Sequence, residues 1–406
     1  MIQHASIFSQ LLTIFPRAEF ATLVRRNRSD YGAKGFNSWT QLVCMLFCHL
    51  AQAKSLREIC NGLRCCLGKL RHLGIVHAPN KSTLSYANEH RTWELYQALF
   101  YKTLETVRVH GPAPRKNKRF RFKNRLLSID ATVIDLCLSL FPWANFRQSK
   151  GAVKLHMLLD HDGYLPTYAL ITEGNISDVH FARFLDLPPD SIVAMDRGYN
   201  DYKLFSKWID RRIWFVTRLK SNAAYEVIET REPIPTRNIL SDEIIRFTGS
   251  GSQKKCPHPL RRVLVWDQEN QREIVLLSNH LTFGASTIAD IYKERWQIEL
   301  FFKALKQNLK IKTFVGTSKN ALKIQIWTAL IAILLIKYLQ FRASFNWSLS
   351  NLVALLRLNL FTYRYIWDWV NNPFDTLPEG IDGVQLTLNF PGFGQQNSKI
   401  KKAEKK

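Results

Sequence analysis

The stretch LLSIDATVIDL, residues 126–136, is where the chain changes from helical to strand-like sequence. Apolar and polar residues alternate around Asp130, which is the pattern of a strand with one buried face. A carboxylate inside such a strand costs free energy unless a cation or a metal ion pairs with it. The stretch therefore predicts the first strand of a sheet and marks Asp130 as a candidate functional residue.

The sequence that follows predicts a mixed sheet. Two strand-like runs flank Asp160-His161-Asp162-Gly163, which is typical of a hairpin turn. Helix-like and strand-like segments then alternate over residues 177–185, 191–195, 200–210 and 213–217. This order predicts an α/β domain. The acids Asp135, Asp160 and Asp162 are expected to be exposed and not to bind metal.

Six further segments surround the first part of this α/β core, which spans residues 126–218. They are a helical N-terminal domain (1–110), a basic linker (111–125), a β-rich insertion (219–284), the final helices of the core (285–345), a C-terminal helical region (346–390) and a disordered basic tail (391–406). The linker begins at a Gly-Pro stop, so the chain after it is expected to fold without the N-terminal domain. The apolar stretch Ile324–Ile336 is too short to span a membrane and predicts a core helix.

The N-terminal domain and the linker are candidates for DNA contact. Trp39–Leu50 predicts a buried helix, and a break near Gly74 separates two later helices. This pattern suits a helix-turn-helix unit or any small bundle. In the linker, Lys118, Arg119 and Arg121 are interleaved with two phenylalanines. Such a run is often only a solvated face, but its place between structured segments favours contact with nucleic acid.

Composition narrows the class of protein. The chain has 406 residues, 46% of them hydrophobic, which excludes bulk disorder and a disulfide-dense scaffold. Its formal net charge is +24, and a body this basic usually binds a polyanion, most often nucleic acid.

The start of the chain lacks the pattern of a secretory signal, and seven cysteines suit a reducing cytoplasm. A metal site is disfavoured because no C-x2-C pair occurs and the flanks are apolar; its candidate ligands would be Cys44, Cys48, His49, Cys60, Cys65 and Cys66.

Two further acidic residues complete a candidate set with Asp130. Asp196 ends an apolar strand, where functional carboxylates are common. Glu299 lies on a helix expected over residues 287–309. At ~100° per residue, four side chains of that helix fall within about 60° of one another. These four are Tyr292, Arg295, Glu299 and Lys306.

Two strand aspartates and a helix glutamate are the oxygen ligands that a two-Mg²⁺ phosphoryl-transfer site needs. Basic and phenolic groups beside the glutamate could hold the flanking phosphates. Each acid alone also has an ordinary explanation. Asp130 or Asp196 could be a capping or ion-paired residue, and Glu299 could pair with Lys303 on its own helix.

These residues resemble the DDE transposases of bacterial insertion sequences, most closely the IS-four group. The four helix residues match every position of that group's Y-x2-R-x3-E-x6-K signature. Asp130-Ala131-Thr132 matches its D-x-T/S strand, and Asp196-Arg197-Gly198-Tyr199 matches its D-R/x-G-Y turn. Lys150-Gly151 and His156 match its Lys-Gly…His hairpin. The resemblance covers residues 120–340, and residues 1–90 look like the helical domain found on many of these transposases.

The resemblance implies a ribonuclease H-like fold and cut-and-paste DNA transposition by two-metal strand cleavage and strand transfer. It implies Mg²⁺, or Mn²⁺ as a substitute, on Asp130, Asp196 and Glu299. The matched Tyr292, Arg295 and Lys306 would contact phosphates at the transposon end. Trp266 is a candidate for stacking on a flipped base.

The same resemblance implies partners: double-stranded DNA with terminal inverted repeats, target DNA, and a second copy of the chain in a homodimeric DNA complex. A bacterial cytoplasm, at the nucleoid, is the expected location, with no membrane partner. Two other functions stay open from the sequence. One is a catalytically inactive, transposase-derived DNA-binding protein, and the other is a ribonuclease H-like nuclease without transposition.

Overall fold

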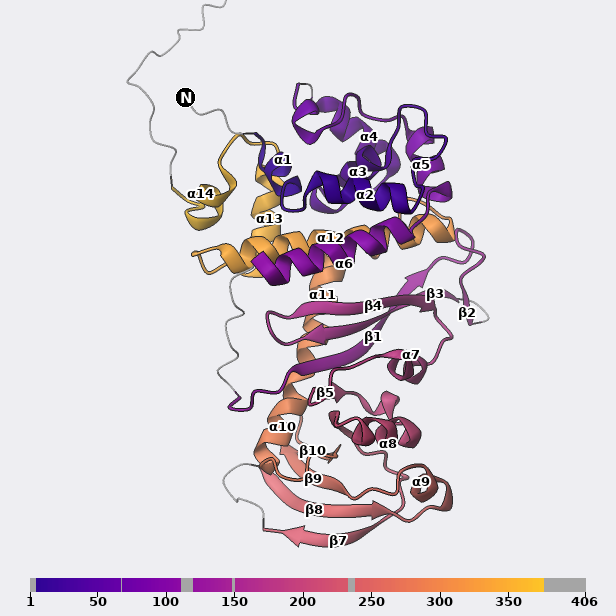
Figure 1. The fold of residues 1–406 in the computed structure, drawn as a ribbon, viewed down its shortest axis with the longest axis vertical. Coiled ribbons are helices and arrows are strands. Elements are labelled where there is room, and N and C mark those ends of the chain that lie inside the picture. The colour runs from indigo at the N-terminus through magenta and orange to yellow at the C-terminus, as the bar shows by residue number, and fades with distance from the viewer. Residues whose placement is uncertain (1–4, 67, 111–119, 148–149, 233–237, 376–406) are drawn as a thin grey trace, which may run out of the picture.

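The computed structural model describes residues 5–66, 68–110, 120–147, 150–232 and 238–375. Helices occupy both ends of this range, and a large sheet occupies its middle (Figure 1). The expected class, an α/β core with helices before and after it, is confirmed.

The N-terminal helices form where apolar residues recur at helical spacing behind polar caps. The side chains of Asn37 and Ser55 accept backbone N–H bonds at the starts of two of them. The expected central helix is present, and all of its residues are buried. The helices are α1 (Ile7–Leu12), α2 (Arg17–Arg26), α3 (Ser38–Leu50), α4 (Leu56–Cys65), α5 (Lys81–His90) and α6 (Glu94–His110), with the 3₁₀ helix η1 (Arg71–Leu73).

The C-terminal helices share one hydrophobic core with the N-terminal ones. They are α12 (Lys319–Arg342), α13 (Leu349–Asn359) and α14 (Ile366–Asn371). Helix α12 packs against α3, α5, α6 and α13, and Figure 1 shows it beside α6, between the other helices and the sheet. Among the described helices, α12 alone has the length and hydropathy of a membrane span, yet 94% of its most apolar window is buried inside the protein. It is the expected core helix, and the N-terminal helices therefore have no separate core.

The middle of the chain forms a ten-stranded sheet. Its first half runs in the order β4-β3-β1-β5-β6, in which β3 and β4 are antiparallel neighbours and β1, β5 and β6 are parallel. Three antiparallel strands followed by two parallel ones is the ribonuclease H-like arrangement. These elements are β1 (Leu126–Leu136), β2 (Asn145–Arg147), β3 (Lys150–Asp160), β4 (Leu165–Glu173), α7 (Asp178–Phe184), β5 (Ile192–Met195), η2 (Arg197–Tyr199), α8 (Tyr202–Asp210) and β6 (Trp214–Arg218).

The β-rich segment after β6 continues the same sheet, because its last strand pairs with β6. Its elements are β7 (Tyr225–Arg231), β8 (Ile239–Phe247), α9 (Ser250–Lys255), β9 (Leu260–Asp267) and β10 (Arg272–Ser278). The sequence did not indicate β8. Its acidic pair interrupts the apolar alternation, and one of those acids, Asp242, is buried against Arg261.

Of the three acids that were expected to be exposed, one is buried. Asp135 and Asp162 are exposed, as expected. Asp160 is instead buried, and its carboxylate pairs with Arg125 at 2.5 Å and Arg108 at 3.6 Å. A turn acid was assumed to face solvent, but these two arginines approach it from α6 and from the segment before β1. Asp160 therefore joins the helical layer to the sheet.

Candidate active site

Asp130 and Asp196 lie at matching positions on neighbouring parallel strands. The register pairs Ile129 of β1 with Met195 of β5, and each aspartate is the next residue. Parallel strands are about 4.8 Å apart, so the two carboxylates leave the sheet side by side. Each accepts a local backbone N–H bond: Asp130 from Ala131 at 2.8 Å, and Asp196 from the residue that follows it at 2.7 Å.

The helix that carries the third acid is broken. A single helix was expected over residues 287–309, but the structure has α10 (Ala285–Glu294) and α11 (Trp296–Asn308), with Arg295 between them. Around the break, Arg295 N–H bonds the Tyr292 carbonyl at 3.1 Å, and Ile298 N–H bonds the Arg295 carbonyl at 3.2 Å. These are bonds to the third preceding residue, so the helix tightens there. Tyr292 consequently belongs to α10, whereas Glu299 and Lys306 belong to α11.

Arg295 is the cation of the site. Its guanidinium lies 2.7 Å from a Glu299 oxygen and 3.5 Å from an Asp130 oxygen. It is also 5.6 Å from the ring centre of Tyr292. The side chain of Arg295 is only 11% exposed, so these charges interact with little solvent screening. The intrahelical partner of Glu299 is thus Arg295, not Lys303.

The pKa values reflect this crowding. Burial, together with the nearby carboxylates of Glu299 and Asp196, raises the pKa of Asp130 to about 6, against the opposing effects of a backbone N–H and Arg295. Burial alone would lower the pKa of Arg295, but Tyr292, Glu299 and Asp130 raise it. Burial also raises the pKa of Tyr292. Asp130, Asp196 and Glu299 therefore form one electrostatic group.

The remaining signature residue, Lys306, contacts the sheet. Its ammonium group donates a hydrogen bond to the Val133 carbonyl of β1 at 2.9 Å, and burial lowers its pKa. In this arrangement Lys306 holds α11 against β1, the strand that carries Asp130. It lies on the expected face of the helix.

The donor set suits a hard divalent cation, although the side chains do not converge on one point. Among the described residues, no three His, Cys, Asp or Glu side chains are arranged to hold an ion. Arg295 engages Glu299 and Asp130 there in the way a cation would. Two buried polar atoms nearby, the Tyr199 hydroxyl and Arg295 Nε, have no hydrogen-bond partner within the described chain. Carboxylate oxygens next to polar atoms that lack hydrogen-bond partners suit Mg²⁺ and the waters that it coordinates.

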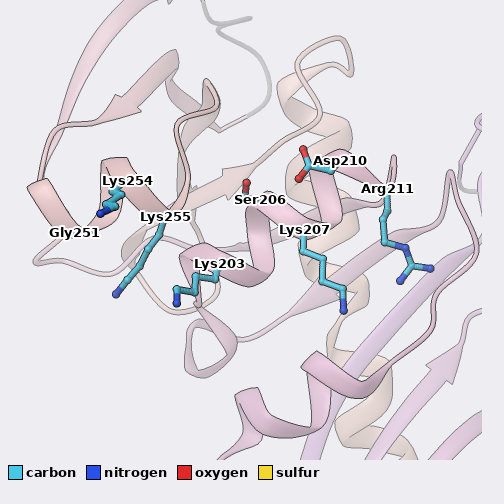
Figure 2. A pocket seen from close by; sticks show the side chains of 8 residues that line it. All are labelled: Lys203, Ser206, Lys207, Asp210, Arg211, Gly251, Lys254 and Lys255. Atoms are coloured by element: carbon cyan, nitrogen blue, oxygen red, sulfur yellow. The ribbon is translucent and has the colours of Figure 1, made fainter.

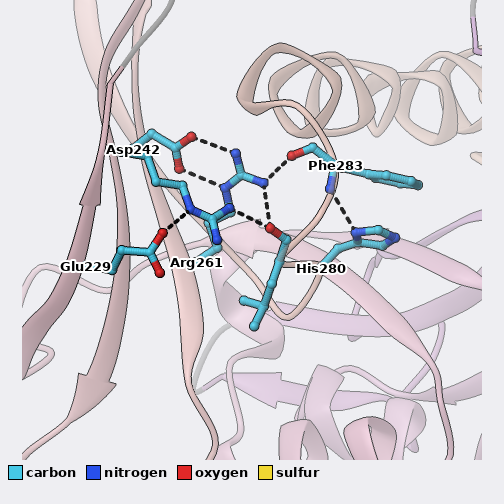
Figure 3. A network of polar contacts seen from close by, with 7 residues as sticks. Glu229, Asp242, Arg261, His280 and Phe283 are labelled. Carbon is cyan, nitrogen blue, oxygen red and sulfur yellow. Dashed lines mark hydrogen bonds and ion pairs between the residues drawn. The ribbon is translucent and has the colours of Figure 1, made fainter.

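A buried polar network fastens the loop before α10 (Figure 3). Arg261 of β9 makes two bonds to Asp242, at 2.7 and 2.6 Å, and it also donates to the carbonyls of Leu281 and Phe283. Phe283 N–H donates to His280 Nδ1 at 3.2 Å, which closes the loop. This network fixes where α10 starts, and hence where Tyr292 lies.

A second buried network lies beside the break. Ser128 Oγ is 2.7 Å from His161 Nε2, and His161 Nδ1 is 3.7 Å from a Glu294 oxygen. The Tyr164 hydroxyl donates to the same oxygen at 3.4 Å. Glu294 is the last residue of α10, so this network ties the helix break to β1 and to the hairpin. Sequence reasoning missed Glu294, whose only signal was an acid at a core-facing position.

Other predicted residues lie apart from this group. Trp266 is on β9, and β5, β6 and β10 separate it from β1, a distance of about 19 Å across the sheet. Lys118 and Arg119 lie outside the described residues, and Arg121 is exposed. The linker phenylalanines, which were expected to favour nucleic-acid contact, instead stack on each other and on Phe283.

The hairpin histidine faces away from the acids. His156 pairs in register with Ala131, one residue beyond Asp130, so it lies on the opposite face of the sheet. Its ring stacks on Phe181 of α7, and its Nε2 is 2.9 Å from Thr172 Oγ1. The side chain of Lys150 lies outside the described part. The cysteines form no metal cluster among the described residues: Cys44, Cys48 and Cys60 are buried, and Cys65 is exposed.

Comparison with protein families gives two matches. A model of the transposase DDE domain matches residues 121–335, slightly more than half of the chain. A model of a domain of unknown function, DUF4372, matches residues 3–76.

Individual proteins agree with the first match. The chain is 31% identical over 264 residues to a putative transposase of Sinorhizobium fredii, covering 64% of this chain and 71% of the relative. It is 29% identical to a probable transposase for insertion sequence element IS5377 of Geobacillus stearothermophilus, covering 63% and 67%. It is 27% identical to a putative transposase for element IS4SA of Synechocystis, covering 64% and 71%. A solved structure of the piggyBac transposase synaptic complex with hairpin DNA aligns at 10% identity and a TM-score of 0.47, covering 87% and 80%.

Proposed function

This chain belongs to the family of DDE transposases, and we propose that it moves an insertion sequence by cutting at terminal inverted repeats and joining the cut ends to target DNA. The observation that carries the proposal is the grouping of three carboxylates: Asp130 and Asp196 lie on adjacent parallel strands, and Arg295 pairs with both Asp130 and Glu299. The net charge of +24 supports a DNA substrate.

Asp130, Asp196 and Glu299 would hold divalent cations, Mg²⁺ or Mn²⁺. A bound pair of cations would supply a stronger oxygen nucleophile and stabilise charge on the leaving oxygen. The protein's own part is to hold Asp130 and Asp196 on adjacent strands and to bring Glu299 to them on α11. For Glu299 to act as a ligand, Arg295 must release it. The guanidinium is then available for a phosphate, which it can bind in a bidentate way.

The other roles follow from the same family. Tyr292 and Lys306 would contact phosphates at the transposon end, and Trp266 would stack on a flipped base. The N-terminal helices would help to select end sequences, and the linker residues Lys118, Arg119 and Arg121 would contact the backbone. We further infer a homodimer in the DNA complex, acting at the nucleoid in the cytoplasm.

The test is cleavage of a plasmid that carries the coding sequence with its natural flanking DNA, because the ends lie there. The full chain should cut at the element's ends with Mg²⁺ or Mn²⁺ and not with EDTA. Asp196→Ala and Glu299→Ala should each abolish cutting while DNA binding survives, since removing an acid also removes repulsion towards phosphate. Asp162→Asn, at an exposed acid of the hairpin, is the matched control and should cut normally.

Cutting that survives in Asp196→Ala would overturn the three-carboxylate mechanism. Binding without any cutting by the unmodified chain would identify an inactive, transposase-derived DNA-binding protein. Cutting without joining to target DNA would identify a nuclease.

A further inference from the structure

The strongest unassigned feature is a basic pocket of about 640 Å³ between α8 and α9. Lys203 and Lys207 contribute to it from α8, and Lys254 and Lys255 contribute from α9. Figure 2 shows Lys203, Lys207 and Lys255 directed to the same side although they come from two helices. Neither the signature residues nor the linker contributes to this pocket.

The lysines of the pocket lack internal counter-charges. All four are exposed, and within the described chain none has an acidic side chain in ion-pair range. The acid of the pocket, Asp210, lies 3.6 Å from His258. Like charges gathered without partners repel one another, so the arrangement is stabilised by an external anion.

The helix that carries Lys203 and Lys207 is packed into the core of the protein. Leu204, Phe205 and Trp208 alternate with the lysines along α8 and are fully or almost fully buried. Ser206 Oγ lies 3.2 Å from His258 Nε2, which links α8 to the loop after α9. The packing of α8 therefore fixes the backbone positions from which Lys203 and Lys207 reach a ligand.

The pocket extends towards the turn that follows Asp196. A second hollow of about 290 Å³ shares Lys203 and Lys255 with it and is also lined by Asn200 and Tyr202. Asn200 directly follows η2, the turn that begins after Asp196. The 3₁₀ turn itself contributes Arg197, which is exposed. The connecting hollow also contains Asp201, which pairs with Arg183, so the cations between the turn after Asp196 and Lys207 that no described acid pairs with are Arg197, Lys203 and Lys255.

We propose that this lysine pocket binds the phosphate backbone of the DNA duplex next to the bond being cut. The proposal rests on the proposed function, because it takes DNA as the substrate of the carboxylate site. Phosphate binding by lysine is independent of sequence. The pocket would therefore hold and orient the duplex, whereas other parts of the protein select the end sequence.

The test compares two triple variants of the full chain that lose the same charge. One is Lys203→Ala, Lys207→Ala and Lys255→Ala. The control is Lys102→Ala, Lys293→Ala and Lys319→Ala, whose lysines are already paired with Glu105, Glu269 and Glu173. Binding to a random-sequence duplex is measured across a salt series. The slope of log K against log[salt] should fall in size by about 0.9 per lost phosphate contact, so by about 2 to 3 in the first variant.

The control should keep the native slope, and a Lys→Arg version of the first triple should restore it. An unchanged slope in the first triple would overturn the proposal, as would an equal loss in both triples, which would mean that net charge alone matters. A cleavage assay with pre-bound DNA at low salt distinguishes weakened DNA binding in the lysine triple from a lack of catalytic activity in the protein itself. The Lys→Ala triple retains its carboxylates and should still cut there, whereas a catalytically inactive DNA-binding protein cuts under no condition.

Discussion

At the scale of single residues, Arg295 explains most of the site. It pairs with Glu299 and Asp130, whose side chains are 33% and 20% exposed, and its own side chain is 11% exposed. A buried carboxylate group without a cation is strongly unfavourable, and breaking a buried ion pair by removing one partner costs about 3–5 kcal/mol. Arg295 therefore substitutes for a metal ion in the stability of the protein before a metal ion binds.

This role of Arg295 predicts how metal affects stability. In Arg295→Met, Asp130 and Glu299 lose their internal cation, so the metal-free protein should melt at a lower temperature. Added Mg²⁺ should then raise the Tm by more than it does in the native chain, because it replaces the missing charge. Thermal unfolding with Mg²⁺ and with EDTA measures both values.

The matched control for Arg295 is Lys293→Met, at an exposed lysine on the same helix that pairs with Glu269. An equal Mg²⁺ effect in the two variants would show that Arg295 does not compensate the carboxylates.

The stability of the protein should also depend on the protonation of the buried His49. His49 is fully buried; its Nδ1 accepts the Lys310 N–H, and its Nε2 lies 3.0 Å from Thr328 Oγ1. Burial lowers its pKa to about 3. The unfolded chain takes up a proton near pH 6.5, whereas the folded one does not. The stabilisation that comes from keeping His49 neutral in the folded protein is therefore complete above pH 6.5. It is lost as the pH falls towards 3.

Unfolding free energies from pH 7 to pH 4.5 test this. In His49→Gln, the free energy of unfolding should change less steeply with pH. The slope should be smaller by at most about 1.4 kcal/mol per pH unit. His77→Gln, at an exposed histidine, should follow the native curve. If the His49→Gln curve runs parallel to the native one, His49 is not neutral in the folded protein.

At the scale of elements, the sequence predicted most of the α/β core but not its interruptions. The first strand, the hairpin and the strand before Asp196 were predictable because apolar alternation and turn residues are local signals. The break at Arg295 was not, because every residue around it is compatible with a helix. The break arises from contacts of Glu294 and Arg295 with β1 and with the hairpin, which lie far away in the sequence. For the same reason β8, whose Asp242 needs Arg261, could not be predicted from local pattern.

The buried Arg261–Asp242 pair is predicted to stabilise the protein and to hold the start of α10 in place. Arg261→Met leaves Asp242 buried without a partner and should destabilise the protein by about 3–5 kcal/mol. Because Arg261 also holds the carbonyls of Leu281 and Phe283, the start of α10 should exchange its amide hydrogens faster. Hydrogen exchange and chemical denaturation measure the two effects.

Arg212→Ala serves as the control, since its pair with Asp190 is exposed and such pairs contribute at most about 1 kcal/mol. The double variant Arg261→Met with Asp242→Leu should recover part of the stability but not the protection of α10. Full protection of α10 in Arg261→Met would rule out the anchoring role.

At the scale of the whole molecule, the described N-terminal and C-terminal helices form one body around α12. The linker suggested separable domains, but α3, α5 and α6 cover α12 directly. We therefore predict that a fragment starting at residue 120 is insoluble or aggregates, because the apolar surface of α12 is uncovered. Co-expression of residues 1–110 as a separate chain should restore solubility. A monomeric, cooperatively unfolding fragment 120–406 would show that the shared core is dispensable.

The position of α12 near the end of the chain also sets an order of events during synthesis. The N-terminal helices leave the ribosome roughly 200 residues before α12 does. At about 5–20 residues per second, they wait some 10–40 s for the helix that covers them. During that time the side of α3 that packs against α12 and α13 is uncovered. The newly made chain is thus a client for chaperones and proteases until translation is nearly complete, and the amount of active protein depends on how it survives that interval.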